Sequence, residues 1–188
     1  WAECSSNSLD AISFSAAAYF FGQMVHTNLN VPVGLIESAW GGTRIEPWIP
    51  VVGFEQEPAL AGILDAVKKR DAASAAVEAN APLDAGQPVA IYNGMIHPVV
   101  PFGIKGALWY QGESNGGEGD EYYSKMRALI GGWRKVWGQG DFPFYFVQLA
   151  PIGESPTDNP AGGDGRAEIR QAQFEALAIP KTGMAVTM

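Results

Sequence analysis

Residues 107–115 read ALWYQGESN, and this stretch decides the fold class. An apolar run ends there in a short polar turn that contains a glycine. The polar side chains of the turn are Gln111, Glu113, Ser114 and Asn115. In open α/β sheets, ligands bind at the carboxyl ends of parallel strands. The stretch therefore predicts a buried strand and a ligand-binding loop, with a plain solvated turn as the alternative.

A second motif has the same form. Residues 33–40, VGLIESAW, are apolar and run into Gly41, Gly42, Thr43 and Arg44. Glycine allows backbone N–H groups to approach a ligand closely, as a site that binds an oxyanion requires. The two turns are predicted to form two walls of one cleft, and parallel neighbouring strands would bring them together.

Helical and strand-like patterns alternate along the chain. Strands are expected over residues 33–39, 105–111, 142–150 and 184–188, the third buried on both faces because it is nearly all apolar. The expected helices are 13–29 with Ser13 as N-cap, 58–79, 119–137, and a last one from Asp164 to Pro180. Residues 80–103 carry four prolines and are expected to be irregular. This order predicts a three-layer αβα fold with a mostly parallel sheet, in one domain over residues 1–188.

Composition excludes several classes of function. The 188 residues are 47% hydrophobic and 17% charged, as in a globular protein, and the net charge of −8 gives no basic surface for nucleic acid. No apolar run reaches the ~18–20 residues that span a membrane. Cys4 is the single cysteine, and no cluster has metal-ligand spacing or the glycine pattern of a phosphate site. We expect no cofactor, metal, nucleic acid or membrane partner; the sequence leaves the oligomeric state open.

Three long motifs carry a resemblance to a known family. They are residues 14–48, which end in SAWGGTRIEPW, residues 92–115, YNGMIHPVVPFGIKGALWYQGESN, and residues 137–151, WGQGDFPFYFVQLAP. In the same order they closely resemble the sialate O-acetylesterase family of SGNH-type carbohydrate esterases. The resemblance implies an SGNH or flavodoxin-like fold and removal of acetyl groups from sugar hydroxyls by a serine nucleophile, without a cofactor. It also implies a secreted or periplasmic protein, because such enzymes act on acetylated glycans.

The same resemblance implies that the catalytic serine and its Asp-x-x-His partner lie outside this sequence. The family's serine block precedes anything that matches Trp1, and its Asp-x-x-His block follows a segment like residues 183–188. Gln23 and Gly94 stand where an aspartate would precede His26 and His97. We therefore expect a partial domain, truncated at both ends and inactive alone. A carbohydrate-binding or degenerate esterase-like domain without chemistry is the alternative function.

The site residues follow from these two arguments. Backbone N–H groups of Gly41 and Gly42 and a side-chain amide are expected to support the oxyanion. The amide is Gln111 or Asn115; Gln111 is favoured because it lies at the strand end.

Glu113 is expected to be a buried, paired carboxylate, with a solvated acid as the alternative. Ser114 also fits the G-x-S-x-G pattern of a nucleophile elbow, but no histidine follows it in the chain. Two of the residues Glu37, Glu46 and Glu113 could also form a carboxylate pair like that of a glycosidase, but their spacing in the sequence singles out no pair.

Substrate contacts are expected from Arg44, Trp48 and His97. Arg44 is placed to bind a sialate carboxylate or else to pair with Glu46 at the surface. Trp48, like Trp40, Trp109 and Tyr110, is equally suited to stacking on a sugar ring or to packing in the core. His97 is either a site residue or a hydrogen-bonded structural histidine.

Overall fold

The computed structural model describes residues 2–5, 14–74, 84–151 and 165–187, which divide between two compact units, Trp1–Trp40 and Gly41–Met188. The smaller unit is built around helix α2 (Ala16–Leu29). Ser15 caps this helix by accepting a hydrogen bond from the Ala18 N–H, while the predicted cap, Ser13, lies outside the described residues.

Residues 31–40 return along helix α2 without forming a strand. The Ser15 N–H donates to Glu37 Oε2 at 3.0 Å, and a Cβ built on Gly22 would lie 2.9 Å from the Leu35 side chain. The predicted strand over 33–39 is therefore wrong. An apolar sequence can adopt an extended conformation, but a strand also requires a neighbour that accepts its backbone hydrogen bonds.

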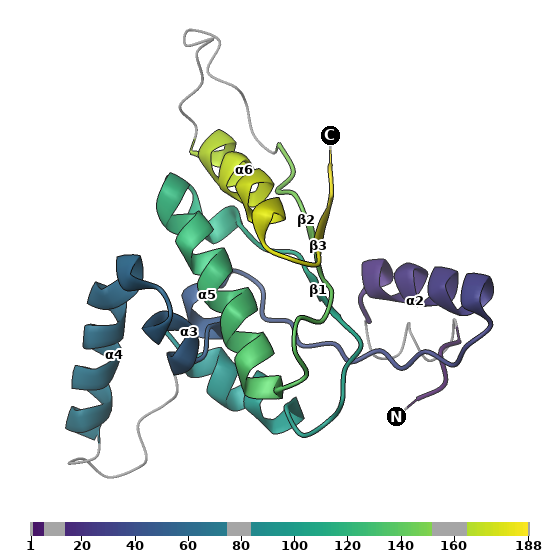
Figure 1. Ribbon diagram of the computed structural model, residues 1–188, viewed down its shortest axis with the longest axis horizontal. Helices are drawn as coiled ribbons and strands as arrows, with labels where there is room; N and C mark the ends of the chain where they lie inside the picture. The colour runs from purple at the N-terminus through teal and green to yellow at the C-terminus, as the bar shows by residue number, and fades with distance from the viewer. Residues whose placement is uncertain (1, 6–13, 75–83, 152–164, 188) are drawn as a thin grey trace, which may run out of the picture. The chain divides into compact units, whose positions relative to one another are not determined.

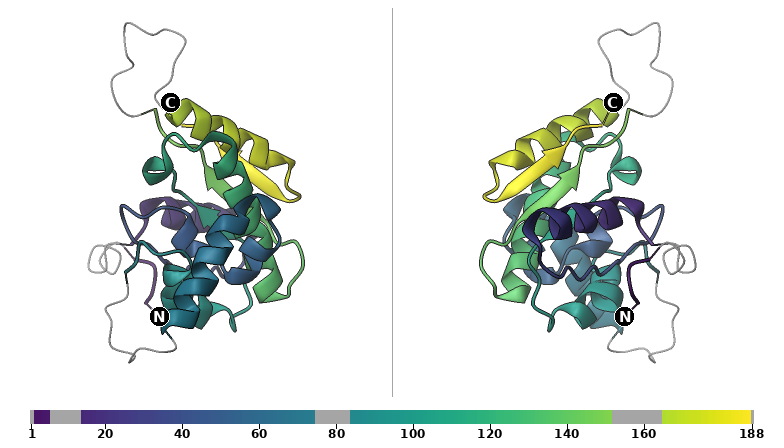
Figure 2. Two further views of the ribbon diagram at one scale, coloured as in Figure 1. Left: turned by 90° about the vertical axis from the view of Figure 1, so that its left-hand side faces the viewer. Right: turned by 90° about the vertical axis from the view of Figure 1, so that its right-hand side faces the viewer.

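The larger unit contains a three-stranded parallel sheet in the order β1-β2-β3 (Figures 1 and 2). Its strands are β1 (Ala107–Trp109), β2 (Phe144–Val147) and β3 (Thr182–Ala185). Ala107 pairs with Phe144, and Phe144 pairs in turn with Thr182. Three of the four predicted strand regions are thus strands, each shorter than expected.

Helices cross between these strands and cover one face of the sheet. The helices are α5 (Gly119–Trp137) between β1 and β2, and α6 (Arg166–Glu175) with the 3₁₀ turn η6 (Ala176–Ala178) between β2 and β3. Trp133 of α5 packs edge-on against Phe144, with 5.8 Å between the ring centroids, and its ring centroid lies 6.2 Å from that of Trp109. Aromatic contacts of this kind fix the helix on the sheet.

Helix α5 begins and ends where the sequence predicts. Its buried face is apolar at helical spacing, and Gly138 takes the left-handed conformation that ends many helices, with φ 63°. For the last helix, α6 and η6 lie within the predicted range, but Asp164 is outside the described residues.

The longer helix α4 and several short helical segments complete the larger unit. They are η1 (Glu46–Trp48), α3 (Val51–Glu55), η2 (Pro58–Leu60), α4 (Ala61–Ser74), the π-helix η3 (Tyr92–Ile96), η4 (His97–Val99) and η5 (Glu113–Asn115). The helix predicted over 58–79 corresponds to η2 and α4, and residues 75–79 lie outside the described part. The part of 80–103 that is described, from residue 84 on, is irregular apart from short helical turns, as expected.

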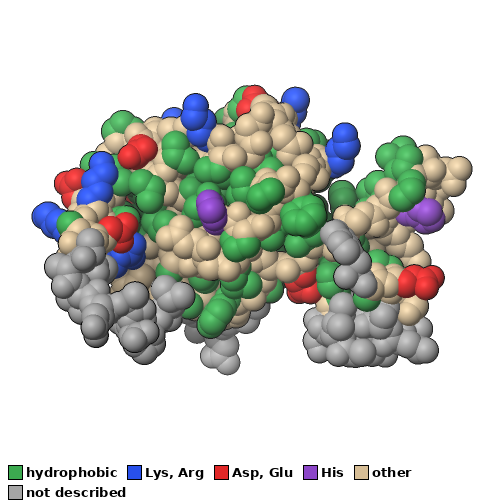
Figure 3. Space-filling model, turned by 90° about the horizontal axis from the view of Figure 1, so that it is seen from below, with side chains coloured by type: hydrophobic (Ala, Val, Ile, Leu, Met, Phe, Trp, Pro, Cys, Tyr) green, Lys and Arg blue, Asp and Glu red, His purple; other side chains and the backbone are tan. Residues whose placement is uncertain are grey.

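The second face of the sheet is less covered than the sequence predicts. Phe144 and Phe146 are buried, whereas Tyr145 between them and Leu108 on β1 are each 43% exposed. The expectation that β2 is buried on both faces is therefore wrong for this structure: its side chains alternate between a buried and a more open face. Figure 3 shows apolar side chains gathered on a surface of the larger unit, with charged groups mainly at the margins.

Helix α3 lies very close to α5, and this contact depends on a small residue. A Cβ built on Gly53 would lie 2.3 Å from the Ala128 carbonyl oxygen and 2.9 Å from Ile49 Cγ2. We expect Gly53→Ala to lower the free energy of unfolding by about 1–3 kcal/mol, because the added methyl group forces the two helices apart. Denaturant unfolding measures the effect.

The matched control is Gly62→Ala in α4, where a Cβ would meet nothing within 4 Å. There alanine should raise stability by about 0.5–1 kcal/mol through helix propensity alone. Equal effects of the two substitutions would contradict the packing argument.

Candidate active site

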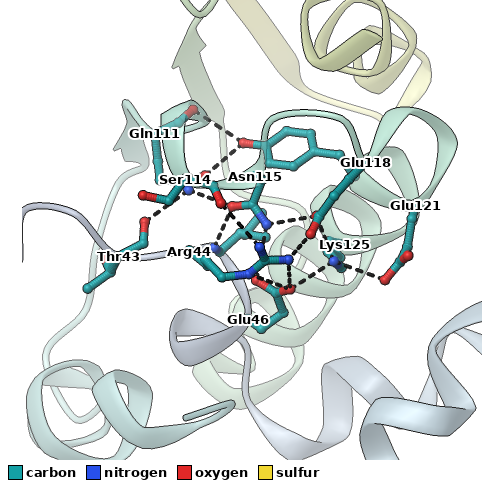
Figure 4. Close-up of polar contacts among 11 residues, drawn as sticks. Thr43, Arg44, Glu46, Gln111, Ser114, Asn115, Glu118, Glu121 and Lys125 are labelled. Atoms are coloured by element: carbon teal, nitrogen blue, oxygen red, sulfur yellow. Dashed lines mark hydrogen bonds and ion pairs between the residues drawn. The ribbon is translucent and has the colours of Figure 1, made fainter. Parts of the chain in front are cut away.

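Two turns far apart in the sequence meet in the larger unit. We refer to residues 41–44 as the glycine turn and to residues 111–115 as the polar loop (Figure 4). Gln111 Nε2 donates to the Thr43 carbonyl at 3.1 Å, and the Ser114 hydroxyl donates to the Gly42 carbonyl at 3.1 Å. The structure brings the two turns together as the sequence predicts, but through side-chain hydrogen bonds instead of neighbouring strands.

Glycines allow both turns to take their shapes. Gly42 has φ +75° and Gly112 has φ +156°, conformations that side chains with a Cβ rarely adopt. A Cβ on Gly41 or Gly42 would meet nothing within 4 Å, so the glycine turn borders open space. Within the described part of the chain, the N–H groups of these two glycines donate to no atom. The turn therefore presents two backbone donors to solvent.

Asn115 is the central residue that joins the two turns. It is fully buried, and both atoms of its amide have two partners. Oδ1 accepts from the Ile45 N–H at 3.0 Å and from Gln111 Nε2 at 2.7 Å. Nδ2 donates to Glu46 Oε2 at 3.1 Å and to Glu118 Oε2 at 2.8 Å. These four bonds fix the orientation of the amide.

A buried ion cluster lies directly behind Asn115. Lys125 of α5, whose side chain is 1% exposed, contacts three carboxylates: Glu46 at 2.8 Å, Glu118 at 2.7 Å and Glu121 at 2.9 Å (Figure 4). Arg44 closes the cluster from the surface side, pairing with Glu46 at 3.0 Å and with Glu118. Each buried charge thus has an opposite charge in contact, which a low-dielectric site requires.

The environment of Glu46 keeps it ionised. Burial by itself raises its pKa, but the hydrogen bond and charge of Lys125, its own backbone N–H and the Asn115 amide more than offset this, so the pKa of Glu46 lies below its ordinary value of 4.5. At neutral pH, Glu46 is therefore a carboxylate that accepts from Lys125, Arg44 and Asn115.

Tyr122 holds the other side of the polar loop. Its hydroxyl lies 2.9 Å from Gln111 Oε1 and 3.2 Å from the Gln111 carbonyl, and its side chain is fully buried. Burial raises the pKa of the Tyr122 phenol above its ordinary value, so it stays a neutral donor. Gln111 therefore accepts at Oε1 and uses both hydrogens of Nε2, one to Thr43 and one to Asn115.

Several predicted residues lie elsewhere than expected. Glu113 is exposed, so the expectation of a buried, paired carboxylate is wrong there. Glu46 is the buried, paired carboxylate, and Glu118 is a second paired one that is partly buried. Trp48 is 4% exposed and packs edge-on against Trp109, with its Nε1 donating to the Thr43 hydroxyl. Trp48 is therefore a core residue that supports the glycine turn and is not free to stack on a sugar.

The described residues contain no pairing between a serine hydroxyl and a histidine ring. Ser114 lies in η5 and donates to Gly42, and α5 starts only at Gly119, which does not match a nucleophile elbow. His97 is exposed in η4 with its ring edge-on to Tyr92. His26 Nδ1 lies 2.8 Å from the Val31 carbonyl in the smaller unit.

Arg44 forms the surface pair with Glu46 that the sequence left as one of two possibilities. Its Nε and Nη2 contact Glu46, Nη2 also contacts Glu118, and Nη1 donates to the Ser114 carbonyl. A guanidinium has five N–H hydrogens. Only one of them, on Nη1, has no partner in the described part of the chain.

Sequence reasoning missed Lys125, Glu118 and Tyr122. The signal was present for Lys125, which lies three residues after Tyr122 and four before Leu129, within the apolar face of α5. A lysine is almost never fully buried unless it is paired, so a lysine within the apolar face of a helix indicates that carboxylates lie nearby. Which carboxylates these are could not be read from spacing.

Two further findings concern the described residues as a whole. Residues 2–5, 14–74, 84–151 and 165–187 hold no group of three His, Cys, Asp or Glu side chains placed to bind a metal ion. In the same residues, none of the helices is long and apolar enough to cross a membrane.

A parallel sheet with a polar loop at the carboxyl end of β1 defines an α/β protein, and the candidate site lies at the sheet edge where such proteins bind ligands. A carbohydrate acetylesterase from Xanthomonas citri, solved by crystallography, matches with a TM-score of 0.69 and 31% identity, over 92% of this chain and 34% of that one. This likeness confirms the predicted three-layer α/β class.

The family follows from the sequence comparisons. The family model described as carbohydrate esterase, sialic acid-specific acetylesterase, matches residues 4–187. Sialate O-acetylesterases of Rattus norvegicus and Homo sapiens are 33% and 31% identical to the chain, each over 93% of it. The chain belongs to this carbohydrate esterase family. It spans about a third of the length of these relatives, 37% and 33% respectively.

The lowered pKa of Glu46 gives a prediction for stability. A carboxyl group whose pKa is depressed by folding contributes stability above its unfolded pKa, here 4.5, and loses it as the pH falls through the folded value. We expect Glu46→Gln to cost about 1–3 kcal/mol of unfolding free energy at neutral pH, because Lys125, Arg44 and Asn115 lose a charged acceptor. This cost should shrink below pH 4.5 in denaturant titrations.

Glu121→Gln serves as the control. Glu121 contacts the same lysine, but its side chain is 53% exposed, so its loss should change stability by less than about 1 kcal/mol. A cost for Glu46→Gln that stays constant from neutral to acid pH would show that the ionised form of Glu46 is not what stabilises the site.

Proposed function

We propose that the protein to which this chain belongs is a carbohydrate O-acetylesterase that removes acetyl groups from sialic acids or related acetylated sugars. The observation that carries the proposal is the meeting of the glycine turn and the polar loop within a chain matched to this family from residue 4 to 187. The family's reaction is attack by a serine on the ester carbonyl, followed by hydrolysis of the acyl-enzyme. An acetylated glycan as substrate also supports a location outside the cytoplasm.

In this proposal the chain supplies the support for the oxyanion. The exposed N–H groups of Gly41 and Gly42 are the donors that are free to bind the negative oxygen that develops during the reaction. One such donor is typically worth ~10²–10³ in rate. Gln111 and Asn115 use their amide hydrogens within the network, so their proposed contribution is to hold the glycine turn in place. Glu113 is exposed and belongs to the same loop, where it is available to contact the substrate or its surroundings.

His97 and Arg44 were both expected to contact the substrate, and the structure supports this for only one of them. His97 is exposed on a turn whose preceding segment is tied to the site, since the Val89 N–H donates to the Glu46 carbonyl at 3.2 Å. Arg44 is half-exposed, but Nε and Nη2 of its guanidinium already contact Glu46, and Nη2 also contacts Glu118. We therefore propose that His97 contacts sugar hydroxyls and that Arg44 mainly stabilises the ion cluster through its contacts with Glu46 and Glu118.

The proposed reaction is tested by measuring acetate release. The full-length protein should release acetate from O-acetylated sialic acid or from an acetylated neutral sugar, and a serine-directed phosphonate should block it. Residues 1–188 alone should hydrolyse aryl acetates no faster than buffer, because a serine without a base is a weak nucleophile.

Each other outcome has a defined meaning. Binding of acetylated sugars by the full-length protein without acetate release would support a carbohydrate-binding domain instead. Serine-dependent turnover by residues 1–188 that Ser114→Ala abolishes would overturn the assignment of the nucleophile.

The role of Arg44 is tested by comparing two substrates. Because its guanidinium is bound within the cluster, Arg44→Ala should lower kcat/KM by about tenfold on both O-acetylated sialic acid and a neutral aryl acetate, through misplacement of the glycine turn. A loss confined to the acidic sugar would show instead that Arg44 binds the sialate carboxylate.

A further inference from the structure

Lys125 is the most buried charged side chain of the cluster, and charged or polar groups from four segments surround it. Glu118 and Glu121 lie beside it at the start of α5, and Glu46 reaches it from η1. Arg44 contacts Glu46 and Glu118 from the glycine turn, and Asn115 of η5 donates to the same two carboxylates. Two cations thus stand among three carboxylates.

The carboxylates of Glu46 and Glu118 are held side by side in this cluster. Both accept from the same Lys125 Nζ and from the same Asn115 Nδ2. Like charges at such short range repel each other unless a cation lies between them. Lys125 is the buried cation in this place, since Arg44 lies at the surface with its side chain 45% exposed.

The position of Asn115 depends on this pair of carboxylates. They accept both of its amide hydrogens, which turns its Oδ1 toward the Ile45 N–H and Gln111 Nε2. Gln111 then reaches Thr43 in the glycine turn. An unbroken series of contacts therefore runs from the lysine to the proposed oxyanion donors.

We propose that Lys125 is a positioning residue for the esterase reaction: its charge holds Glu46 and Glu118 together in the ionised form that fixes Asn115, and through Asn115 the polar loop and the glycine turn. The catalytic part of this inference rests on the proposed function. The structural part, which concerns how the two turns are held, does not.

Removal of the cation has a characteristic dependence on pH. In Lys125→Met an apolar chain of similar length fills the space. The two carboxylates lose the buried cation that they share and keep only the half-exposed Arg44 as a cationic partner. Near pH 5 one of them can take up a proton and donate a hydrogen bond to the other, which restores the arrangement. Near pH 8 both are ionised and repel each other, so the loop is displaced. A lysine that merely filled space would give the same loss at both pH values.

The test compares the full-length Lys125→Met variant with the native protein at each pH, which cancels the titration of the catalytic base. We expect kcat on an acetylated sugar to fall about 100-fold near pH 8 and less than about threefold near pH 5, with KM within about twofold of native. The double variant Lys125→Met, Glu118→Gln removes the repulsion and should regain at least about tenfold of kcat near pH 8.

A second readout does not depend on activity. The Ile45 N–H is buried and donates to Asn115 Oδ1, so its hydrogen exchange reports whether Asn115 is in place. In Lys125→Met the exchange should be fast near pH 8 and protected near pH 5, relative to native at the same pH. Lys135→Met on the exposed side of the same helix is the matched control and should leave both readouts unchanged.

The outcomes separate the two proposals. A native protein that releases no acetate from any sugar ester refutes the proposed function, and Ile45 exchange alone then decides the role of Lys125. An active native protein with a variant that keeps native kcat and Ile45 protection at both pH values, or loses them equally at both, overturns the inference. If Lys125→Met does not fold, Glu118→Gln takes its place: kcat should fall about tenfold at constant KM, and an unchanged kcat overturns the inference.

Discussion

A buried ammonium group sets the main physical constraint on this structure. Removing a charge from water costs several kcal/mol even after relaxation, so a lysine side chain that is 1% exposed requires carboxylates in contact with it. Those carboxylates come from two places in the chain: η1, which begins two residues after Arg44, and the N-cap and first turn of α5. The need to neutralise one cation therefore brings together the segments that form the site.

Helix α5 connects this electrostatic requirement to the hydrophobic core. Toward its C-terminal half it presents Trp133 to the sheet and lies against α3 at Gly53. Near its N-terminus the same face carries Tyr122 and Lys125, which hold the polar loop and the cluster. Packing against the sheet thus fixes the height and rotation of the helix, and with them the position of the charged groups. A site built on a packed helix is held more firmly than one built on loops alone.

The sequence predicted the features that depend on local pattern. Helix α5 was predicted from about Gly119 to Trp137 because its apolar spacing is a local signal, and the structure has these bounds. The strands around Ala107 and Phe144 followed from short apolar runs, although their ends did not. The prediction of a strand over 33–39 was wrong because a strand needs a neighbouring strand for its backbone hydrogen bonds, and the sequence of one segment does not specify that neighbour.

The candidate site was predicted in part for the same reason. Glycines and polar residues after two expected strands indicated where the two turns would lie, and the contact between the turns is present in the structure. Which carboxylate is buried depends on side-chain direction in three dimensions: Glu113 points outward from η5, whereas Glu118, five residues later, reaches Lys125. Trp48 was similarly ambiguous, since a tryptophan in a core and one against a sugar have the same sequence surroundings.

The bond between the Ile45 N–H and Asn115 also has a consequence for the order of folding. It joins residues 70 positions apart, whereas the crossovers β1-α5-β2 and β2-α6-β3 each close over shorter stretches of chain. Loop closure over longer separations loses more chain entropy, so contacts between nearby segments are expected to form first. The sheet and α5 can then assemble before the glycine turn arrives, and the last step of folding is the one that completes the site. A contact that forms late is also expected to open before the sheet and α5 in the native state, so the glycine turn should separate from the polar loop before the fold is lost.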